Sequence, residues 1–329
     1  MIISKYEQII KLIDTASTIA VFMHINPDGD CIGSALALTK FLKNKNKSVI
    51  CYAPNLDRDC LPDKFAFLDG FFDISIEKPT EKFDLCIAVD VAEATRLGDI
   101  CYRIFIKGSK TALVDHHLPT QTYADVEIRE QTAASTTQIL YKILSDCDDA
   151  CIDEKVAECL YTGLLTDSGS FSFESTTPET HIVAAKLLEK GINASEINRY
   201  VIKDVKQNVY VLKNRILSNT EKYEDGKIGL IVFTQKDFVE TATDEKDTDG
   251  IINNVINIIG VELAISISEI GDKAYKISFR SKHNVDSSAC AKCFGGGGHF
   301  HAAGCRAYGY FEDVKAKVLS VAKEMLSYA

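Results

Sequence analysis

The order of apolar and polar positions divides the chain into two α/β segments. In the first half, short apolar runs rich in β-branched residues alternate with stretches whose apolar residues recur at helical spacing. The apolar runs are "STIAVFMH", "SVICYAP", "FDLCIAVD" and "TALVDHH". Short apolar strands with helices between them are typical of a parallel sheet that is buried on both faces. We therefore expect an N-terminal α/β domain built on a parallel sheet.

The pattern becomes helical after about residue 155 and then returns to strands. Three stretches have helical spacing: "KVAECLYTGLLTDSGSF", "PETHIVAAKLLEKG" and "INRYVIKDVKQNVYVLKNRILSNT". The third carries both charge signs, and we interpret it as one long helical connector. A second α/β pattern begins near Lys227 and includes "KIGLIVFTQ", "ELAISISEI", "AYKISFRS" and "CRAYGY". These patterns predict a first domain over residues 1–190, a helical linker over 191–222 and a smaller α/β domain over 223–329.

Composition and charge narrow the range of partners. The 329 residues are 46% hydrophobic and 26% charged, with a formal net charge of -10. An acidic chain is poorly suited to long duplex nucleic acid, which draws on many Lys and Arg contacts, but it can bind a short phosphorylated ligand through metal ions. No apolar run reaches the roughly 18 residues of a membrane span, and the N-terminal stretch lacks the features of a signal peptide.

The cysteines indicate a reducing compartment. There are 11 of them, an odd number, scattered from Cys31 to Cys305. In a chain of this length they are interpreted as reduced and mostly buried thiols, so we expect a cytoplasmic protein. The pair in "CAKC" has no second pair to complete the four ligands of a structural zinc site.

Possible metal ligands stand where the predicted strands end. The strands "TIAVFMH", "LCIAVD" and "TALVDHH" finish in, or run on to, His24, Asp28, Asp30, Asp90, Asp115, His116 and His117. A further acid, Asp167, follows the apolar stretch in "LLTDSGSF". Because the carboxyl ends of parallel strands share one edge of a sheet, these side chains are expected to converge.

Structural explanations exist for single members of this set. Asp28 could cap a helix, and Asp84, at the start of its strand, is interpreted as a solvated charge. The set as a whole is harder to explain in this way, because three of the seven histidines end strands beside carboxylates. An EF-hand is excluded, since its fifth position would be the apolar Ile32 and no Glu stands at its twelfth.

The ligand types favour a particular class of metal. Carboxylates with a minority of imidazoles and no thiolates suit Mn²⁺ or Mg²⁺. At least four acids and two histidines exceed the needs of one ion. Two ions about 3.5–4 Å apart that share a carboxylate, as in phosphoester hydrolases, would use them.

Four stretches together resemble a known family. "HINPDGDCIGS", "VDVAEATRLG", "VDHH" and "TDSGSF", in that order, are similar to the four motifs of the DHH phosphoesterases. "SFRSKHNVD" and "FGGGGHFHAAG" resemble the DHH-associated C-terminal domain. The resemblance covers nearly the whole chain and is strongest to the short two-domain members, the bacterial nano-RNases.

The resemblance implies a role for each strand-end residue. His24 and Asp28 would bind one ion, whereas Asp30, His116 and Asp167 would bind the other. Asp90 would bridge the two ions. His117 would lie beside the phosphate as a catalytic residue, and Asp115 would orient a neighbouring histidine.

A second predicted site lies in the C-terminal domain. The run "GGGGHFHAAG" is either a flexible loop or a concave nest of backbone N–H groups that binds an anion. Arg280 just upstream offers a planar fork for phosphate. The resemblance implies that Arg280, Gly296, Gly297 and His299 bind substrate. It also favours Arg96 and Ser34, the latter at the start of a helix that would attract phosphate.

The function implied by the resemblance is metal-dependent phosphoester hydrolysis. The expected substrates are short oligoribonucleotides (nano-RNA and linear dinucleotides), cut to mononucleotides, and 3′-phosphoadenosine 5′-phosphate, which would lose its 3′-phosphate. The expected cofactor is a pair of Mn²⁺ ions, with Mg²⁺ as the alternative, in an active site between the two domains. A phosphodiesterase for cyclic or linear dinucleotide second messengers and a non-catalytic nucleotide-binding protein stay open, as does a homodimer. No membrane partner is expected.

Overall fold

A five-stranded sheet organises the first half of the chain. In the computed structural model, which describes residues 4–80, 82–118 and 121–327, its strands are all parallel in the spatial order β2-β1-β3-β4-β5. The strands are β1 (Thr18–Phe22), β2 (Ser48–Tyr52), β3 (Leu85–Val89), β4 (Lys110–Asp115) and β5 (Val126–Arg129). The predicted parallel sheet is therefore confirmed. The hydrophobic pattern missed β5, because its sequence "VEIR" alternates instead of forming an apolar run.

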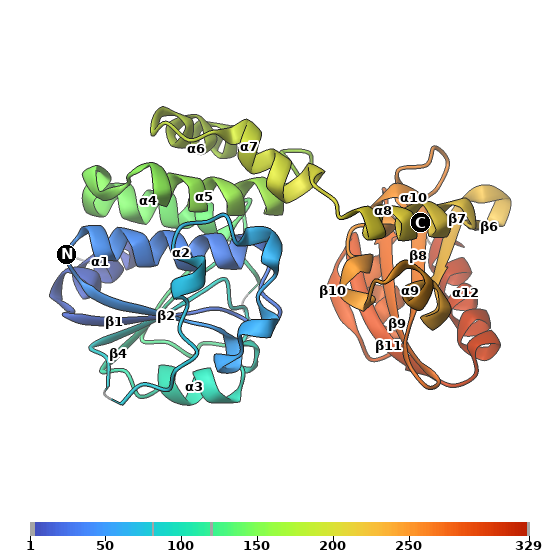
Figure 1. Cartoon of the computed structure of the whole chain (residues 1–329), viewed down its shortest axis with the longest axis horizontal. Coiled ribbons are helices and arrows are strands. Elements are labelled where there is room, and N and C mark those ends of the chain that lie inside the picture. The colour runs from blue at the N-terminus through green and yellow to red at the C-terminus, as the bar shows by residue number, and fades with distance from the viewer. Residues whose placement is uncertain (1–3, 81, 119–120, 328–329) are drawn as a thin grey trace. The chain divides into compact units, whose positions relative to one another are not determined.

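Helices cover both faces of this sheet. They are α1 (Lys5–Thr15), α2 (Gly29–Asn44), α3 (Asp99–Phe105), α4 (Thr136–Asp148), α5 (Glu154–Asp167), α6 (Pro178–Glu189) and α7 (Ala194–Asn198). Figure 1 shows α3 on the opposite side of the sheet from α2, α4 and α5. Successive residues of a strand point to opposite faces, so Ile19 and Val21 join the larger core with α2, α4 and α5, whereas Ala20 and Phe22 join the smaller core under α3. The continuous apolar strands follow from burial on both sides.

Short 3₁₀ segments fill the connections of the first half. They are η1 (Pro54–Leu56), η2 (Arg58–Cys60), η3 (Asp63–Phe65), η4 (Phe71–Asp73), η5 (Ala94–Leu97) and η6 (Asp149–Cys151).

Glycines let α2 and α5 cross at short distance. A Cβ added at Gly33 of α2 would lie 2.5 Å from the carbonyl oxygen of Cys159 in α5. A Cβ added at Gly163 of α5 would lie 2.8 Å from Oδ1 of Asp30 in α2. Both distances are shorter than real contacts, so this crossing requires glycine. The crossing brings the start of α2 against α5.

The predicted connector helix is wrong as a single element. After α7 the chain makes a π-helical turn, η7 (Arg199–Lys203), and Asp204 is extended before α8 (Gln207–Ser218) begins. The two parts pack on different partners, since α7 contacts α5 and α8 contacts α9 and β7. The helical spacing therefore continues across two helices that pack on different elements. The chain divides into two compact units between Asp204 and Val205, inside the range expected to be a linker.

The second unit is built on a mixed six-stranded sheet in the order β10-β11-β9-β8-β7-β6. Its strands are β6 (Glu221–Tyr223), β7 (Ile228–Phe233), β8 (Leu263–Gly271), β9 (Ala274–Ser281), β10 (Gly297–His299) and β11 (Ala302–Tyr308). Its further helices are α9 (Gln235–Thr241), α10 (Ile252–Ile256), α11 (Ser287–Lys292) and α12 (Phe311–Ser327), with 3₁₀ segments η8 (Glu224–Gly226) and η9 (Glu245–Thr248). The pair β7–β8 is parallel and the other pairs are antiparallel. The expected smaller α/β domain is therefore confirmed.

Two cores stabilise this second sheet. Ile265, Ile277 and Phe279 lie in the core that also contains Cys290 of α11 and Val318 of α12. The opposite face has its own core, in which side chains of β7 pack with α8, α9 and α10.

Among the described helices, none combines the length and the apolar character that crossing a bilayer would require.

Candidate metal centre

Three neighbouring strand ends build the centre. His24 follows β1 by two residues, Asp90 directly follows β3, and Asp115 ends β4 before His116 and His117. Because these strands are adjacent and parallel, their carboxyl ends place the side chains together. His24 Nε2 lies 3.4 Å from Asp90 Oδ2, and His116 Nε2 lies 3.8 Å from Asp90 Oδ1.

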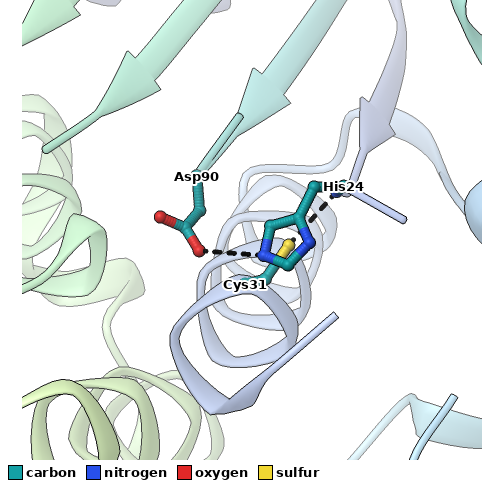
Figure 2. Close-up of side chains that lie close together, drawn as sticks. All are labelled: His24, Cys31 and Asp90. Atoms are coloured by element: carbon teal, nitrogen blue, oxygen red, sulfur yellow. Dashed lines mark hydrogen bonds and ion pairs between the residues drawn. The ribbon is translucent and has the colours of Figure 1, made fainter. Parts of the chain in front are cut away.

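The donor atoms form three overlapping groups among the described residues. Within each group, one donor atom per residue lies within 4.8 Å of the others. The groups are His24, Cys31 and Asp90; Asp90, His116 and His117; and Asp30, His116 and Asp167. Asp90 and His116 each belong to two groups, and His116 Nε2 lies 3.2 Å from Asp167 Oδ2. Figure 2 shows the first group, which includes a thiol that the sequence analysis did not count as a ligand.

Asp90 has an unusual backbone. Its φ is 59°, in the left-handed region that residues other than Gly seldom adopt. Its side chain is 2% exposed and accepts a hydrogen bond from Thr136 Oγ1 at 3.0 Å. Strained backbone of this kind clusters at functional sites, so the conformation supports a role for this carboxylate in the centre.

Helix α2 starts earlier than the sequence predicted. Asp28 is its N-cap, and Asp28 Oδ1 accepts hydrogen bonds from the backbone N–H groups of Asp30 and Cys31, both at 3.1 Å. The helix therefore begins at Gly29, and the expectation that Ser34 stands at its start is wrong. Ser34 is fully buried, and its hydroxyl has no hydrogen-bond partner among the described residues. Asp28 lies outside the three donor groups.

The start of α4 holds Asp30. The backbone N–H of Thr136 donates to Oδ2 at 2.6 Å, and the N–H and hydroxyl of Thr137 donate to Oδ1 at 3.0 and 2.9 Å. Ser135 caps this helix by accepting from Gln138 N–H. None of these three residues was predicted from the sequence. Their run "STT" before an apolar helix is a capping signal, but such caps are common and do not identify a distant carboxylate as partner.

His117, Asp115 and Arg129 form a series of charged hydrogen bonds. His117 Nδ1 donates to Asp115 Oδ1 at 2.8 Å, and Arg129 Nη1 donates to Asp115 Oδ2 at 3.0 Å. Asp115 is fully buried, so both contacts satisfy a carboxylate that water does not reach. The arrangement orients the imidazole of His117. Arg129 was not predicted as a site residue, and it lies on β5, the strand that the hydrophobic pattern missed.

Arg96 lies next to His24. The backbone N–H of Ile25 donates to the carbonyl of Arg96 at 2.7 Å, which ties the two loops together. Arg96 Nη2 lies 3.1 Å from His24 Nδ1. His24 Nδ1 also lies 2.8 Å from the carbonyl oxygen of Ile25. With Nδ1–H donating to Ile25, a bound cation would replace the Nε2 proton that faces Asp90, and the Nε2 lone pair would bind the cation.

The electrostatics of the centre favour a cation. Burial raises the pKa of Asp30 and of Asp167, and the negative charges of neighbouring aspartates raise both further. Burial also acts to raise the pKa of Asp90, but the hydrogen bond and positive charge of His24, with the other imidazoles, outweigh it and lower that pKa. Carboxylates crowded in this way repel one another, and a divalent ion would relieve the repulsion. The donor set therefore fits divalent metal ions.

The predicted substrate residues of the second unit lie on its sheet. The glycine run is neither a free loop nor an isolated nest, because Gly297 and His299 in β10 pair with Gly304 and Ala302 in β11. Ala302 also pairs with Arg280 on β9, so His299 and Arg280 flank one residue across three strands. A Cβ added at Gly296 would lie 2.3 Å from the carbonyl oxygen of Gly304, so the start of the hairpin requires glycine.

Comparison with known protein families agrees with this fold. The model of the DHH family N-terminal domain matches residues 18–164, and the model of the DHHA1 domain matches residues 229–327. The chain therefore contains a DHH-family N-terminal domain and a DHHA1 domain.

Relatives and solved structures resemble both units. The chain is 28% identical over 308 residues to the bifunctional oligoribonuclease and PAP phosphatase NrnA of Bacillus subtilis, covering 93% of this chain and 94% of the relative. It is 29% identical over 317 residues to the NrnA of Thermus thermophilus, covering 94% and 91%. The crystal structure of an exopolyphosphatase-related protein from Bacteroides fragilis has a TM-score of 0.91 at 26% identity, covering 97% of this chain and 96% of that one.

Proposed function

We propose that the protein is a metal-dependent phosphoesterase that hydrolyses short oligoribonucleotides to mononucleotides and removes the 3′-phosphate of 3′-phosphoadenosine 5′-phosphate. The observation that carries the proposal is the convergence of Asp30, Asp90, His116 and Asp167 in overlapping donor groups. The full-length similarity to two NrnA proteins supports the choice of substrates.

The proposed metal ligands follow the donor groups. Asp30, His116 and Asp167 would hold one ion, His24 and Asp28 a second, and Asp90 would contact both. Bound divalent ions, proposed to be two Mn²⁺ with Mg²⁺ as the alternative, would supply a water of lowered pKa and compensate negative charge on phosphate. The capping role of Asp28 occupies its Oδ1 only, so its other carboxylate oxygen is compatible with this assignment.

His117 is the proposed catalytic residue outside the ligand set. Burial acts to lower its pKa, but the hydrogen bond to Asp115 and the charge of Asp90 raise it. A protonated, oriented imidazole can donate to a phosphate oxygen on which negative charge develops. Arg129 holds Asp115, so we propose a positioning role for both residues. Arg96 would add a second cationic donor for phosphate.

The second unit is proposed to bind the part of the substrate away from the scissile bond, through Arg280, Gly296, Gly297 and His299. We keep the proposed division into a catalytic domain over 1–190, a linker over 191–222 and a substrate-binding domain over 223–329. We also propose a preference for short substrates. The odd number and scatter of the cysteines support our proposal of a cytoplasmic location.

A substrate panel tests the proposal. Purified protein with Mn²⁺ is offered a linear diribonucleotide, 3′-phosphoadenosine 5′-phosphate, a cyclic dinucleotide, pyrophosphate, inorganic polyphosphate and an RNA of about 24 nucleotides, and initial rates are compared. We expect the first two to be hydrolysed fastest and Asp90→Ala to abolish turnover while nucleotide binding persists. Asp63→Ala, which removes an exposed carboxylate of the same unit, is the matched control and should keep full activity.

Other outcomes of this substrate panel would contradict the proposed function or replace it with another. A preference for polyphosphate or pyrophosphate would contradict it, and a preference for the cyclic dinucleotide would identify a second-messenger phosphodiesterase. Equal rates on the long RNA and the dinucleotide would refute the preference for short substrates. Nucleotide binding without hydrolysis of any substrate would indicate a binding protein.

A further inference from the structure

A thiol lies inside the metal centre. Cys31 is the third residue of α2 and is fully buried. Its Sγ, a ring nitrogen of His24 and a carboxylate oxygen of Asp90 all lie within 4.8 Å of one another. Figure 2 shows the three side chains meeting where β1 and β3 end and α2 begins. Nitrogen, sulfur and oxygen donors therefore stand together at the part of the centre proposed for the ion of His24.

The hydrogen bonds of this thiol suit a sulfur that binds a cation. The backbone N–H of His24 donates to Cys31 Sγ at 3.3 Å. The thiol's own acceptor, the carbonyl oxygen of Val89, lies 3.8 Å away, which is long even for the weak donor S–H. Burial and the negative charges of Asp90 and Asp28 raise the pKa of this thiol, whereas the N–H of His24 lowers it. The thiol would therefore lose its proton only when a cation binds the sulfur, and N–H donors of this kind support sulfur ligands.

We propose that Cys31 is a thiolate ligand at His24 and Asp90, so that this half of the centre selects a thiophilic divalent ion such as Zn²⁺. The inference rests on the proposed metal centre and replaces Mn²⁺ with Zn²⁺ for the ion of His24 alone. Zn²⁺ binds imidazole, thiolate and carboxylate, whereas Mn²⁺ is suited to oxygen donors. The group of Asp30, His116 and Asp167 contains no sulfur, so the two halves differ in the metal they prefer. On binding, the thiol proton passes to solvent.

Cobalt spectroscopy provides a direct test on the full chain. Co²⁺ is added to metal-free protein kept reduced with a phosphine, and the near-ultraviolet thiolate-to-cobalt charge-transfer band is recorded. We expect the band in the wild type and its loss in Cys31→Ser. The control is Cys86→Ser, which removes another fully buried thiol, on β3, that belongs to no donor group among the described residues. It should keep the band.

Metal affinity provides the second readout. Sites with nitrogen and oxygen donors already prefer Zn²⁺ to Mn²⁺, so the comparison is between variants. Calorimetry should show that Cys31→Ser weakens Zn²⁺ binding about tenfold or more and changes Mn²⁺ binding less than about twofold. An equal loss for both ions would indicate a structural role and overturn the inference.

The cobalt spectrum of the wild type tests whether a thiolate binds the metal, even if the Cys31→Ser variant fails to fold. Ligand-field bands of bound Co²⁺ without the charge-transfer band would overturn this inference and leave the metal centre intact. No Co²⁺ binding at all would overturn the proposed metal centre as well.

Discussion

Hydrogen bonds from a distant helix fix the carboxylate of Asp30, a candidate metal ligand. It is 1% exposed, and three hydrogen bonds from Thr136 and Thr137 hold both of its oxygens. A carboxylate fixed in this way presents its remaining lone pairs in one direction without help from water. Its partners come from the first turn of another helix, more than 100 residues along the chain.

The first prediction concerns the hydroxyl of Thr137. Thr137→Val keeps the shape and the backbone N–H but removes the bond from Oγ1 to Asp30. We expect Mn²⁺ affinity, measured by calorimetry, to fall about tenfold, and Thr137→Ser to restore most of it. Thr162→Val is the control, because that buried hydroxyl bonds only the carbonyl of Glu158 in its own helix. If the Val and Ser variants bind Mn²⁺ equally well, the positioning role is disproved.

At the residue scale, the sequence located the candidate ligands better than the residues that hold them. His24, Asp90 and His116 were predicted because they end apolar strands, and strand ends can be recognised from local pattern. Thr137 and Arg129 were not predicted, because a hydroxyl in a cap and an Arg near a strand end have many ordinary explanations. Their role depends on a partner that only folding brings near.

The close crossing of α2 and α5 is the element-scale feature that shapes the site. Gly33 and Gly163 have no side chains, and a larger residue at either position would keep these helices apart. Asp30 lies near the start of α2, and Asp167 is the last residue of α5. The crossing therefore sets the distance between two acids of the same donor group.

The second prediction tests this crossing. In Gly33→Ala the new methyl would lie 2.5 Å from the carbonyl oxygen of Cys159, and backbone cannot move aside as a flexible side chain can. We expect a loss of about 1–3 kcal/mol in the free energy of unfolding by urea. Circular dichroism is the suitable probe, because the chain contains no Trp.

The matched control for that variant is Gly271→Ala. A Cβ there meets only Ala274 at 3.8 Å, so the free energy of unfolding should change by less than about 1 kcal/mol. Equal stability of the two variants would show that α2 and α5 can separate without cost.

The hydrophobic pattern predicted the strands that were continuous apolar runs. The four apolar strands of the first sheet were expected, whereas β5, with four alternating residues, was not. The connector carried helical spacing throughout, yet it breaks at Asp204, because α7 and α8 pack on different partners. Local spacing does not record which surface each turn of a helix will contact.

Two units with separate cores form the whole molecule. The donor groups all lie in the first unit, and the predicted substrate residues Arg280 and His299 lie in the second. Metal binding and substrate affinity should therefore respond to different perturbations.

The third prediction follows from the crowded carboxylates of the first unit. Mn²⁺ at about 100 times its dissociation constant should raise the melting temperature of this unit by about 5–10 °C, because the ion binds the folded state alone. Excess chelator should reverse the shift. Calorimetry with hydrogen exchange on peptides assigns each transition, and the second unit serves as the internal control. An equal shift in both units would argue against a centre confined to the first.

The fourth prediction concerns Arg280. Arg280→Ala should raise the KM for a dinucleotide about tenfold or more and change kcat less than about twofold, because it removes a charged hydrogen-bond donor remote from the reacting bond. Arg306→Ala is the control, an exposed Arg on the neighbouring strand β11 that should leave KM unchanged. A fall in kcat at constant KM would assign Arg280 to the chemical step instead.

The sequence by itself determined the two α/β patterns, the strands of the first sheet and the acids and histidines at their ends. This was possible because burial imposes an apolar period on the chain that can be read locally. Only the tertiary structure decided that α4 holds Asp30 and that Cys31 joins His24 and Asp90. These features depend on contacts between distant segments, where small changes of packing select the partners, and no local period encodes them.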